Sequence, residues 1–178
     1  MLRVYSGMAK LYWLTGYSGA GKTTVGKELY KILKEENNAT VFLDGDEMRK
    51  VFGDDLGYTK EDRYKAAMRY AKLCNFLTSQ GLDVVCCTVS MFNAVRDWNR
   101  ENTKNYIEVY LKVPQEVLQE RDQKGMYSGQ QQGTTNNVVG VDLVMEEPQN
   151  PNIIIENDGS LTPQEAAKAI YEGESYCV

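Results

Sequence analysis

Histidine is absent from the 178-residue chain, so mechanisms that depend on an imidazole cannot operate in it. A Ser-His-Asp triad, a Cys-His nucleophile and a histidine-ligated zinc site are all excluded. Any chemistry must therefore use carboxylates, lysines, arginines, hydroxyls and backbone amides.

Long apolar runs and paired cysteines are missing as well. No stretch reaches the roughly 18 consecutive apolar residues of a membrane-spanning helix, and the first ten residues do not resemble a cleavable leader. The four cysteines form no Cys-x-x-Cys motif, which indicates reduced thiols. We therefore expect a soluble, cytoplasmic protein with no membrane partner.

An excess of positive charge is also lacking. The chain has 20 Lys and Arg residues against 25 Asp and Glu, which gives a formal net charge of -5 and a pI of about 4.9. Such a surface repels a phosphate backbone as a whole, although a local pocket can still hold an anion. General nucleic-acid binding is not expected.

Apolar periodicity predicts strands and helices in alternation. Strands are expected at 11–15, 39–43, 82–89, 106–113 and 152–155. A first helix is expected from the glycine-rich turn to about residue 36. Further helices are expected at 64–80, at 93–102, at 114–121 and from 162 onward. Strands joined by helical crossovers pair in parallel. The length suits one α/β domain spanning residues 1–178.

One segment interrupts this alternation. Residues 125–141 are seventeen residues without a charge, and they include four glycines. A loop of this length inside a compact domain is typically functional or disordered. We expect a mobile lid over about 124–147, with a floppy surface insertion as the alternative.

Residues 16–23, Gly-Tyr-Ser-Gly-Ala-Gly-Lys-Thr, match the phosphate-loop pattern G-x-x-x-x-G-K-[ST] between a predicted strand and a predicted helix. Successive backbone amides and the helix N-terminus suit a phosphate, Lys22 would reach the outer phosphates, and Thr23 would occupy a Mg²⁺ position. The pattern predicts ATP or GTP binding. Its candidate ligands are Gly16, Ser18, Gly19, Ala20, Gly21, Lys22, Thr23 and Thr24.

The second predicted strand ends in Asp44-Gly45-Asp46. Two carboxylates beside a phosphate loop could orient hydrated Mg²⁺ and accept a proton from an attacking hydroxyl, as phosphoryl transfer requires. The alternative is that the aspartate caps the next helix. The position of the pair at the carboxyl end of a parallel strand favours the site.

Further segments support one family. Residues 56–63 read Leu-Gly-Tyr-Thr-Lys-Glu-Asp-Arg, 89–92 read Val-Ser-Met-Phe, and 121–127 read Arg-Asp-Gln-Lys-Gly-Met-Tyr. Together with Asp-Gly-Asp-x-x-Arg at 44–49, they resemble Leu-Gly-Phe-Ser-x-x-Asp-Arg, Ser-Pro-aromatic and Arg-Asp-x-Lys-Gly-Leu-Tyr of the adenylylsulfate (APS) kinases. The resemblance extends in order from about Lys10 to Ile170.

This resemblance implies a P-loop kinase-like, three-layer αβα fold with a five-stranded parallel sheet. It also implies an enzyme that phosphorylates the ribose 3′-hydroxyl of a nucleotide acceptor with MgATP. The implied donor-side and catalytic residues are Lys22 and Thr23 for phosphate and metal, Asp44 for metal and substrate, Asp46 as base, Ser90 at the family's active-site serine, and Arg121 and Lys124 at the donor nucleotide.

On the acceptor side the resemblance implies that Arg49 and Arg63 hold anionic groups and that Tyr58 stacks on the base. The residues themselves leave alternatives open. The arginines could form surface ion pairs, Tyr58 could be a packing residue, and Ser90 could be a simple hydroxyl at a strand end.

The chain departs from the family pattern on the acceptor side. After Asp-Arg the family usually continues x-x-Asn-x-Arg-Arg, whereas Ala66 and Met68 replace the amide and one arginine, and the lid lacks the family's lysines and second aromatic residue. Phe92, Tyr127 or Tyr64 could compensate in a true APS kinase. Alternatively, the acceptor is a smaller nucleotide, as in the cytidine diphosphoramidate kinases, and the two acceptors are weighed equally.

Two other function classes remain as alternatives. A non-transferring nucleotide switch is disfavoured because the chain has no guanine-reading Asn-Lys-x-Asp segment. A nucleoside monophosphate kinase usually carries several lid arginines, and residues 125–141 contain none. The sequence leaves the oligomeric state open, a homodimer included.

Overall fold

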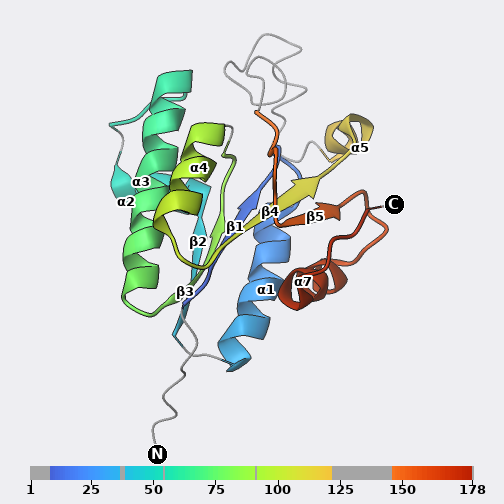
Figure 1. The fold of residues 1–178 in the computed structure, drawn as a ribbon. Helices are drawn as coiled ribbons and strands as arrows, with labels where there is room; N and C mark the ends of the chain where they lie inside the picture. The colour runs from blue at the N-terminus through green and yellow to red at the C-terminus, as the bar shows by residue number, and fades with distance from the viewer. Residues whose placement is uncertain (1–8, 37–38, 54, 91, 122–145, 178) are drawn as a thin grey trace, which may run out of the picture.

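A computed structural model of the chain describes residues 9–36, 39–53, 55–90, 92–121 and 146–177 (Figure 1). Its sheet has five parallel strands in the order β2-β3-β1-β4-β5. The strands are β1 (Leu11–Thr15), β2 (Thr40–Asp44), β3 (Asp83–Cys87), β4 (Tyr106–Lys112) and β5 (Ile153–Glu156). The five expected strands and their parallel pairing are thus confirmed.

The helices are α1 (Lys22–Glu36), α2 (Gly45–Phe52), α3 (Lys60–Ser79), α4 (Asn93–Asn102), α5 (Gln115–Glu120) and α7 (Pro163–Glu172). The expected 93–102 helix is found with the same bounds, and the closing helix has its capping box between Thr162 and Glu165. Helix α2 was not predicted from the sequence. The predicted start of α3 is also four residues late, because Thr59 caps that helix by accepting the Asp62 amide.

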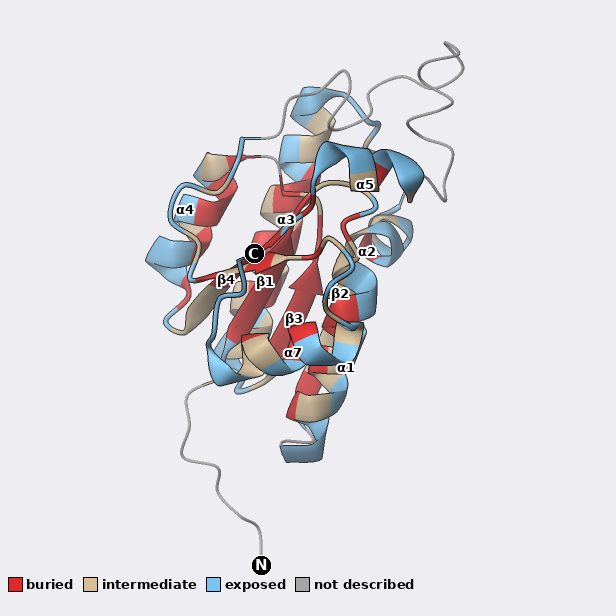
Figure 2. Ribbon diagram, turned by 90° about the vertical axis from the view of Figure 1, so that its right-hand side faces the viewer, coloured by how far each residue is buried: buried red, intermediate tan, exposed pale blue. Residues whose placement is uncertain are grey.

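The strands form the middle layer, and the central strands β1, β3 and β4 are the most deeply buried (Figure 2). Side chains alternate along β1: Tyr12 and Leu14 pack with the buried faces of α1 and α7, whereas Leu11 and Trp13 pack with those of α2, α3 and α4. This alternation makes the three-layer αβα arrangement that the resemblance implied. Among the described residues, no helix is long and apolar enough to cross a membrane.

Helix α1 lies very close to the sheet at Gly26. A Cβ atom on this glycine would lie 2.3 Å from Cys87 Sγ and 3.2 Å from the Phe42 ring. Burial raises the pKa of the Cys87 thiol, and the thiol donates to the Lys22 carbonyl at 3.2 Å. The contact fixes the first turn of α1 above the carboxyl end of β3.

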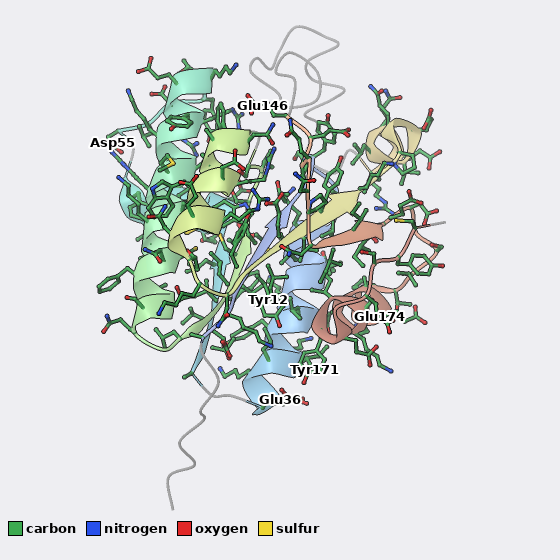
Figure 3. The ribbon with its side chains drawn as sticks, in the orientation of Figure 1. Tyr12, Glu36, Asp55, Glu146, Tyr171 and Glu174 are labelled. Atoms are coloured by element: carbon green, nitrogen blue, oxygen red, sulfur yellow. The ribbon has the colours of Figure 1, made fainter. Side chains whose placement is uncertain are left out.

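The neighbouring strands β1 and β3 are each followed by a connection, and the two connections run on opposite faces of the sheet. The α1 connection returns to β2, and the α4 connection crosses to β4. Adjacent strands with such connections open a crevice at their carboxyl ends, where α/β proteins bind ligands. Asp55 and Glu146 lie toward this end of the molecule, and Glu36 and Tyr171 lie toward the other (Figure 3).

Candidate active site

The phosphate loop follows β1 and leads directly into α1. Gly21 has φ +86°, and a Cβ there would lie 2.6 Å from Asn157 Nδ2; a Cβ on Gly16 would lie 2.5 Å from the Leu111 carbonyl oxygen. Both positions therefore require glycine, the first for its backbone conformation and both for the close approach. The loop is held against the ends of β4 and β5.

Lys22 is the first residue of α1, and its side chain turns back over the loop. Its Nζ donates to the carbonyl oxygens of Gly16 at 2.9 Å and Tyr17 at 2.6 Å. An ammonium group at the mouth of the loop adds to the positive end of the helix dipole. The expected phosphate-binding elements are thus present in one place.

Asp44 joins the phosphate loop to the first turn of α2. Its Oδ2 accepts the Thr23 hydroxyl at 2.6 Å, and its Oδ1 accepts the Asp46 amide at 2.9 Å, which caps α2. The capping interpretation is therefore confirmed, whereas a role of this residue in the site stays a prediction. The cap aims one carboxylate oxygen at Thr23 and places Asp46 on the exposed first turn of α2.

Two arginines lie against the Tyr58 ring. The guanidinium carbons of Arg49 and Arg63 are 4.6 Å and 5.3 Å from the ring centroid, and Tyr58 is 57 % exposed. Arg49 donates to the carbonyls of Leu56 and Gly57, and Arg63 to that of Tyr58. Two guanidinium groups on one ring concentrate positive charge at this point. Burial and the charge of Arg49 lower the pKa of Arg63.

Ser90 and Phe92 follow β3. Ser90 is fully buried, and its hydroxyl has no hydrogen-bond partner in the described part of the chain. Phe92 packs edge-on against Tyr64 with ring centroids 5.2 Å apart. The described contacts therefore connect Phe92 to the first turns of α3 through Tyr64, whereas no general base in the described residues is hydrogen-bonded to Ser90.

On the donor side, Arg121 Nη1 donates to the Asn157 carbonyl at 2.8 Å. The Asn157 side chain in turn donates to the Ala20 carbonyl at 2.8 Å and is buried. The sequence analysis missed Asn157, because its contact with the loop spans 137 residues and no motif announces it. Lys124, Tyr127 and residues 122–145 of the expected lid lie outside the described residues.

Mg²⁺ suits the oxygens that meet at Thr23 and Asp44. A hydroxyl and a carboxylate are the hard donors that this ion prefers, and it usually takes only one or two carboxylates together with water and substrate phosphates. In the described residues, no group of three or more Cys, Asp or Glu side chains could hold a metal without such help. The donor set therefore fits an ion that arrives with a nucleotide.

Comparison with known proteins shows the family. The family model for adenylylsulphate kinase matches residues 8–156. The chain belongs to the adenylylsulphate kinase family. It is therefore a nucleotide kinase, an enzyme that transfers a phosphoryl group to an alcohol.

Two curated relatives carry different names. The cytidine diphosphoramidate kinase of Campylobacter jejuni is 41% identical over 147 residues, which cover 83% of this chain and 85% of the relative. The adenylyl-sulfate kinase of Halothermothrix orenii is 38% identical over 158 residues, which cover 89% and 85% of the respective chains. Sequence similarity alone therefore does not decide between the acceptors named for these two relatives.

A solved structure supports the same fold. The Mycobacterium tuberculosis APS kinase CysC in complex with AMPPNP and APS matches with a TM-score of 0.86 and 26% identity, covering 93% of this chain and 97% of that chain. The P-loop kinase fold inferred from the sequence is thereby confirmed.

Asn157 provides a test of how the phosphate loop is held. Asn157→Ala leaves the buried Ala20 carbonyl unpaired, and we expect the free energy of unfolding to fall by about 1–3 kcal/mol. Asn157→Asp should lower the free energy of unfolding further, because a carboxylate oxygen would face the Ala20 carbonyl oxygen and repel it. Urea unfolding measures both. The neighbouring Asp158→Asn, which keeps an acceptor oxygen for the Ser160 amide, is the control; equal stability in all three variants would contradict the anchoring role.

Proposed function

We propose that the chain transfers the γ-phosphoryl group of ATP to the ribose 3′-hydroxyl of a nucleotide. The observation that carries this proposal is the 2.6 Å contact between Thr23 and Asp44. This contact joins the phosphate loop to the start of α2, which carries the exposed Asp46. Arg49 of the same helix lies against the Tyr58 ring together with Arg63. A donor phosphate and an acceptor sugar can thus meet at the same edge of the sheet.

The donor half of the reaction uses the loop and the start of α1. Loop amides, the helix dipole and Lys22 would bind the phosphates and stabilise negative charge on the group in transfer. Thr23 and Asp44 would hold Mg²⁺, which when bound neutralises charge on the β- and γ-phosphates. Arg121, fixed through Asn157, would contact the donor nucleotide.

The acceptor half uses α2 and the segment before α3. Asp46 would accept the proton of the attacking hydroxyl, since it is exposed on the first turn of α2 beside Asp44. Arg49 and Arg63 would bind the anionic part of the acceptor, and the exposed face of Tyr58 would stack on its base. Ser90 stays a predicted active-site residue.

For the acceptor we favour a pyrimidine nucleotide of the cytidine diphosphoramidate type. The supporting observation is Ala66, which is buried and lines the hollow between Arg49, Arg69 and Tyr70 where the family pattern has an asparagine. An alanine leaves the polar edge of a purine without that partner. In addition, Arg69 is held by Asp55 in a bidentate pair with contacts of 2.9 and 2.6 Å.

Adenylylsulfate remains the second candidate. Phe92 and Tyr64 supply aromatic surface on the acceptor side, which could compensate for the missing amide. A homodimer and a cytoplasmic location stay predictions of the sequence.

Acceptor choice is tested by coupled ADP release with ATP and each acceptor in turn. We expect kcat/KM to favour cytidine diphosphoramidate by at least about tenfold, because an unpaired buried polar group costs about 1–3 kcal/mol. A preference for adenylylsulfate would overturn the acceptor assignment and leave phosphoryl transfer intact. If no ADP is released with either acceptor, the proposed reaction itself is contradicted.

The same assay applied to Ala66→Asn provides a matched variant. Restoring the amide should raise relative use of adenylylsulfate by about tenfold. Thermal unfolding of the variant shows whether the larger side chain is accommodated. An unchanged acceptor ratio in a stable variant would show that residue 66 does not read the base.

The catalytic roles are tested with Asp46→Asn and Lys22→Ala. Asp46→Asn should lower kcat by at least about a hundredfold, as expected for a lost general base, while ATP binding measured by calorimetry is unchanged. Lys22→Ala should lower kcat by a similar factor and also weaken ATP binding. Glu47→Gln, on the same helical turn and paired with Lys50, is the control; normal turnover in Asp46→Asn would remove the base assignment.

A further inference from the structure

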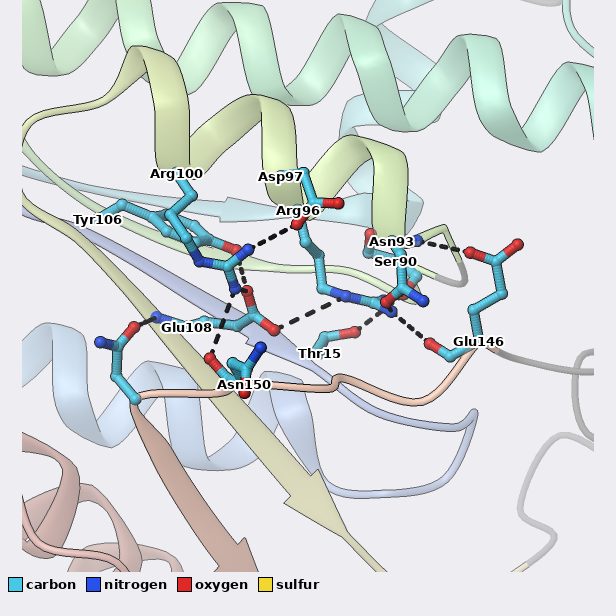
Figure 4. A network of polar contacts seen from close by, with 11 residues as sticks. Thr15, Ser90, Asn93, Arg96, Asp97, Arg100, Tyr106, Glu108, Glu146 and Asn150 are labelled. Atoms are coloured by element: carbon cyan, nitrogen blue, oxygen red, sulfur yellow. Dashed lines mark hydrogen bonds and ion pairs between the residues drawn. The ribbon is translucent and has the colours of Figure 1, made fainter.

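Helix α4 carries a buried arginine that the reaction scheme does not use. The Arg96 side chain is 1% exposed. It points from α4 toward β4 and toward the segment that starts at Glu146 (Figure 4). Burial lowers the pKa of its guanidinium, with Glu108 as the nearest opposing charge. Such a group is retained only where its partners compensate for the lost hydration.

The hydrogen bonds of Arg96 all reach the active-site end of the molecule. The guanidinium donates to the Ser90 carbonyl, to Asn93 Oδ1 and to the Glu146 carbonyl. The Thr15 hydroxyl, which immediately precedes the phosphate loop, also donates to the Ser90 carbonyl at 3.3 Å. One side chain thus connects the turn after β3 to the segment that leads into β5.

Glu146 reinforces this connection from the other side. Its carboxylate accepts the Asn93 amide at 2.7 Å, at the N-terminus of α4. Phe92 occupies the N-cap position of this helix and has no side-chain acceptor to offer. The cap of α4 is therefore supplied from 53 residues away, and Phe92 is left to pack on Tyr64.

Charge balance for Arg96 comes from Glu108 on β4. Glu108 Oε1 lies 3.7 Å from Arg96 Nε, and its Oε2 accepts from Arg100 at 2.8 Å and from Tyr106 at 2.9 Å. Burial raises the pKa of Glu108, and the tyrosine hydroxyl and both arginines oppose that shift. Arg100 is 41% exposed and contacts neither Ser90 nor Glu146 in the contacts described.

We infer that Arg96 is a positioning residue for the acceptor side, which fixes the turn carrying Ser90 and Phe92 through the carbonyls of Ser90 and Glu146. This inference rests on the proposed function, because it assigns Phe92 to the acceptor. A buried ion pair by itself adds little stability, and Glu108 already has Arg100 as a partner. What Arg96 adds is the connection to three polar groups at the carboxyl end of the sheet.

The test compares three variants. Arg96→Met removes the connection but leaves Glu108 with less compensation, which is expected to destabilise the fold. Arg96→Met combined with Glu108→Gln removes the connection and the buried charge together. Arg100→Gln is the matched control, because it removes a cation from the same carboxylate and leaves the contacts to Ser90 and Glu146 in place.

Steady-state kinetics with both substrates gives the decisive comparison. The acceptor KM should rise about tenfold to a hundredfold in Arg96→Met and in the double variant, since small misplacements of a positioning group cost that much. The KM for ATP should change less than about twofold in both, and Arg100→Gln should keep both constants. A double variant that recovers stability and the acceptor KM would overturn the inference, as would an Arg100→Gln variant with the same acceptor defect.

Hydrogen exchange separates this inference from the proposed function. Even if no acceptor is turned over, amides in residues 88–96 and 146–152 should exchange faster in the double variant than in the wild type, while those of β1 are unchanged. Unaltered exchange in both segments would show that Arg96 does not hold them. Faster exchange without turnover would support the positioning role and contradict only the assigned reaction.

Discussion

The structure depends on the hydrogen bond between Thr23 and Asp44, which joins segments that follow two strands separated by β3. β3 lies between β1 and β2, so the residues that follow β1 and β2 would not meet through the sheet alone. Helix α1 lies so close to β3 at Gly26 that its first turn reaches over the end of that strand, and Thr23 bonds to Asp44 at 2.6 Å. A larger residue at position 26 would lift the helix and separate the phosphate loop from the two aspartates.

The donor side and the acceptor side of the site are built differently. The phosphate loop is local in sequence, and its conformation comes from glycine backbone and the start of one helix. The proposed acceptor side brings together α2, the Tyr58 segment and the turn after β3, and this turn is held by the distant pair Arg96 and Glu146. On the proposed function, a buried position such as Ala66 would alter substrate choice while leaving the donor side unchanged.

Local patterns explain why most of the fold could be predicted from the sequence. Short apolar runs and one alternating segment located all five strands, and the helix expected to open at 162 is found as α7, with a capping box between Thr162 and Glu165. Helix α2 was not predicted because it has only eight residues and most of them are polar. In addition, the Asp44-Gly45-Asp46 segment was assigned to the site in preference to a helix cap. The family, identified from four short motifs, is confirmed by its model and relatives.

Tertiary contacts explain what the sequence could not give. Asn157 holds the Ala20 carbonyl across 137 residues, and Glu146 caps a helix across 53. Neither residue type nor spacing distinguishes them from ordinary surface asparagines and glutamates. The roles of Asp46, Ser90 and the arginines remain predictions, because position in a site does not by itself establish what a side chain does.

The central claim is that both substrates meet at the edge joined by Thr23 and Asp44, with the sugar hydroxyl as the point of attack. Phosphorus and proton NMR of the product formed from ATP and the preferred acceptor would show where the phosphoryl group is attached. The account predicts a new phosphate monoester coupled to the ribose H3′, with one ADP formed for each product. A phosphoryl group on the acceptor's own phosphate chain, or inorganic phosphate released with the acceptor unchanged, would contradict it.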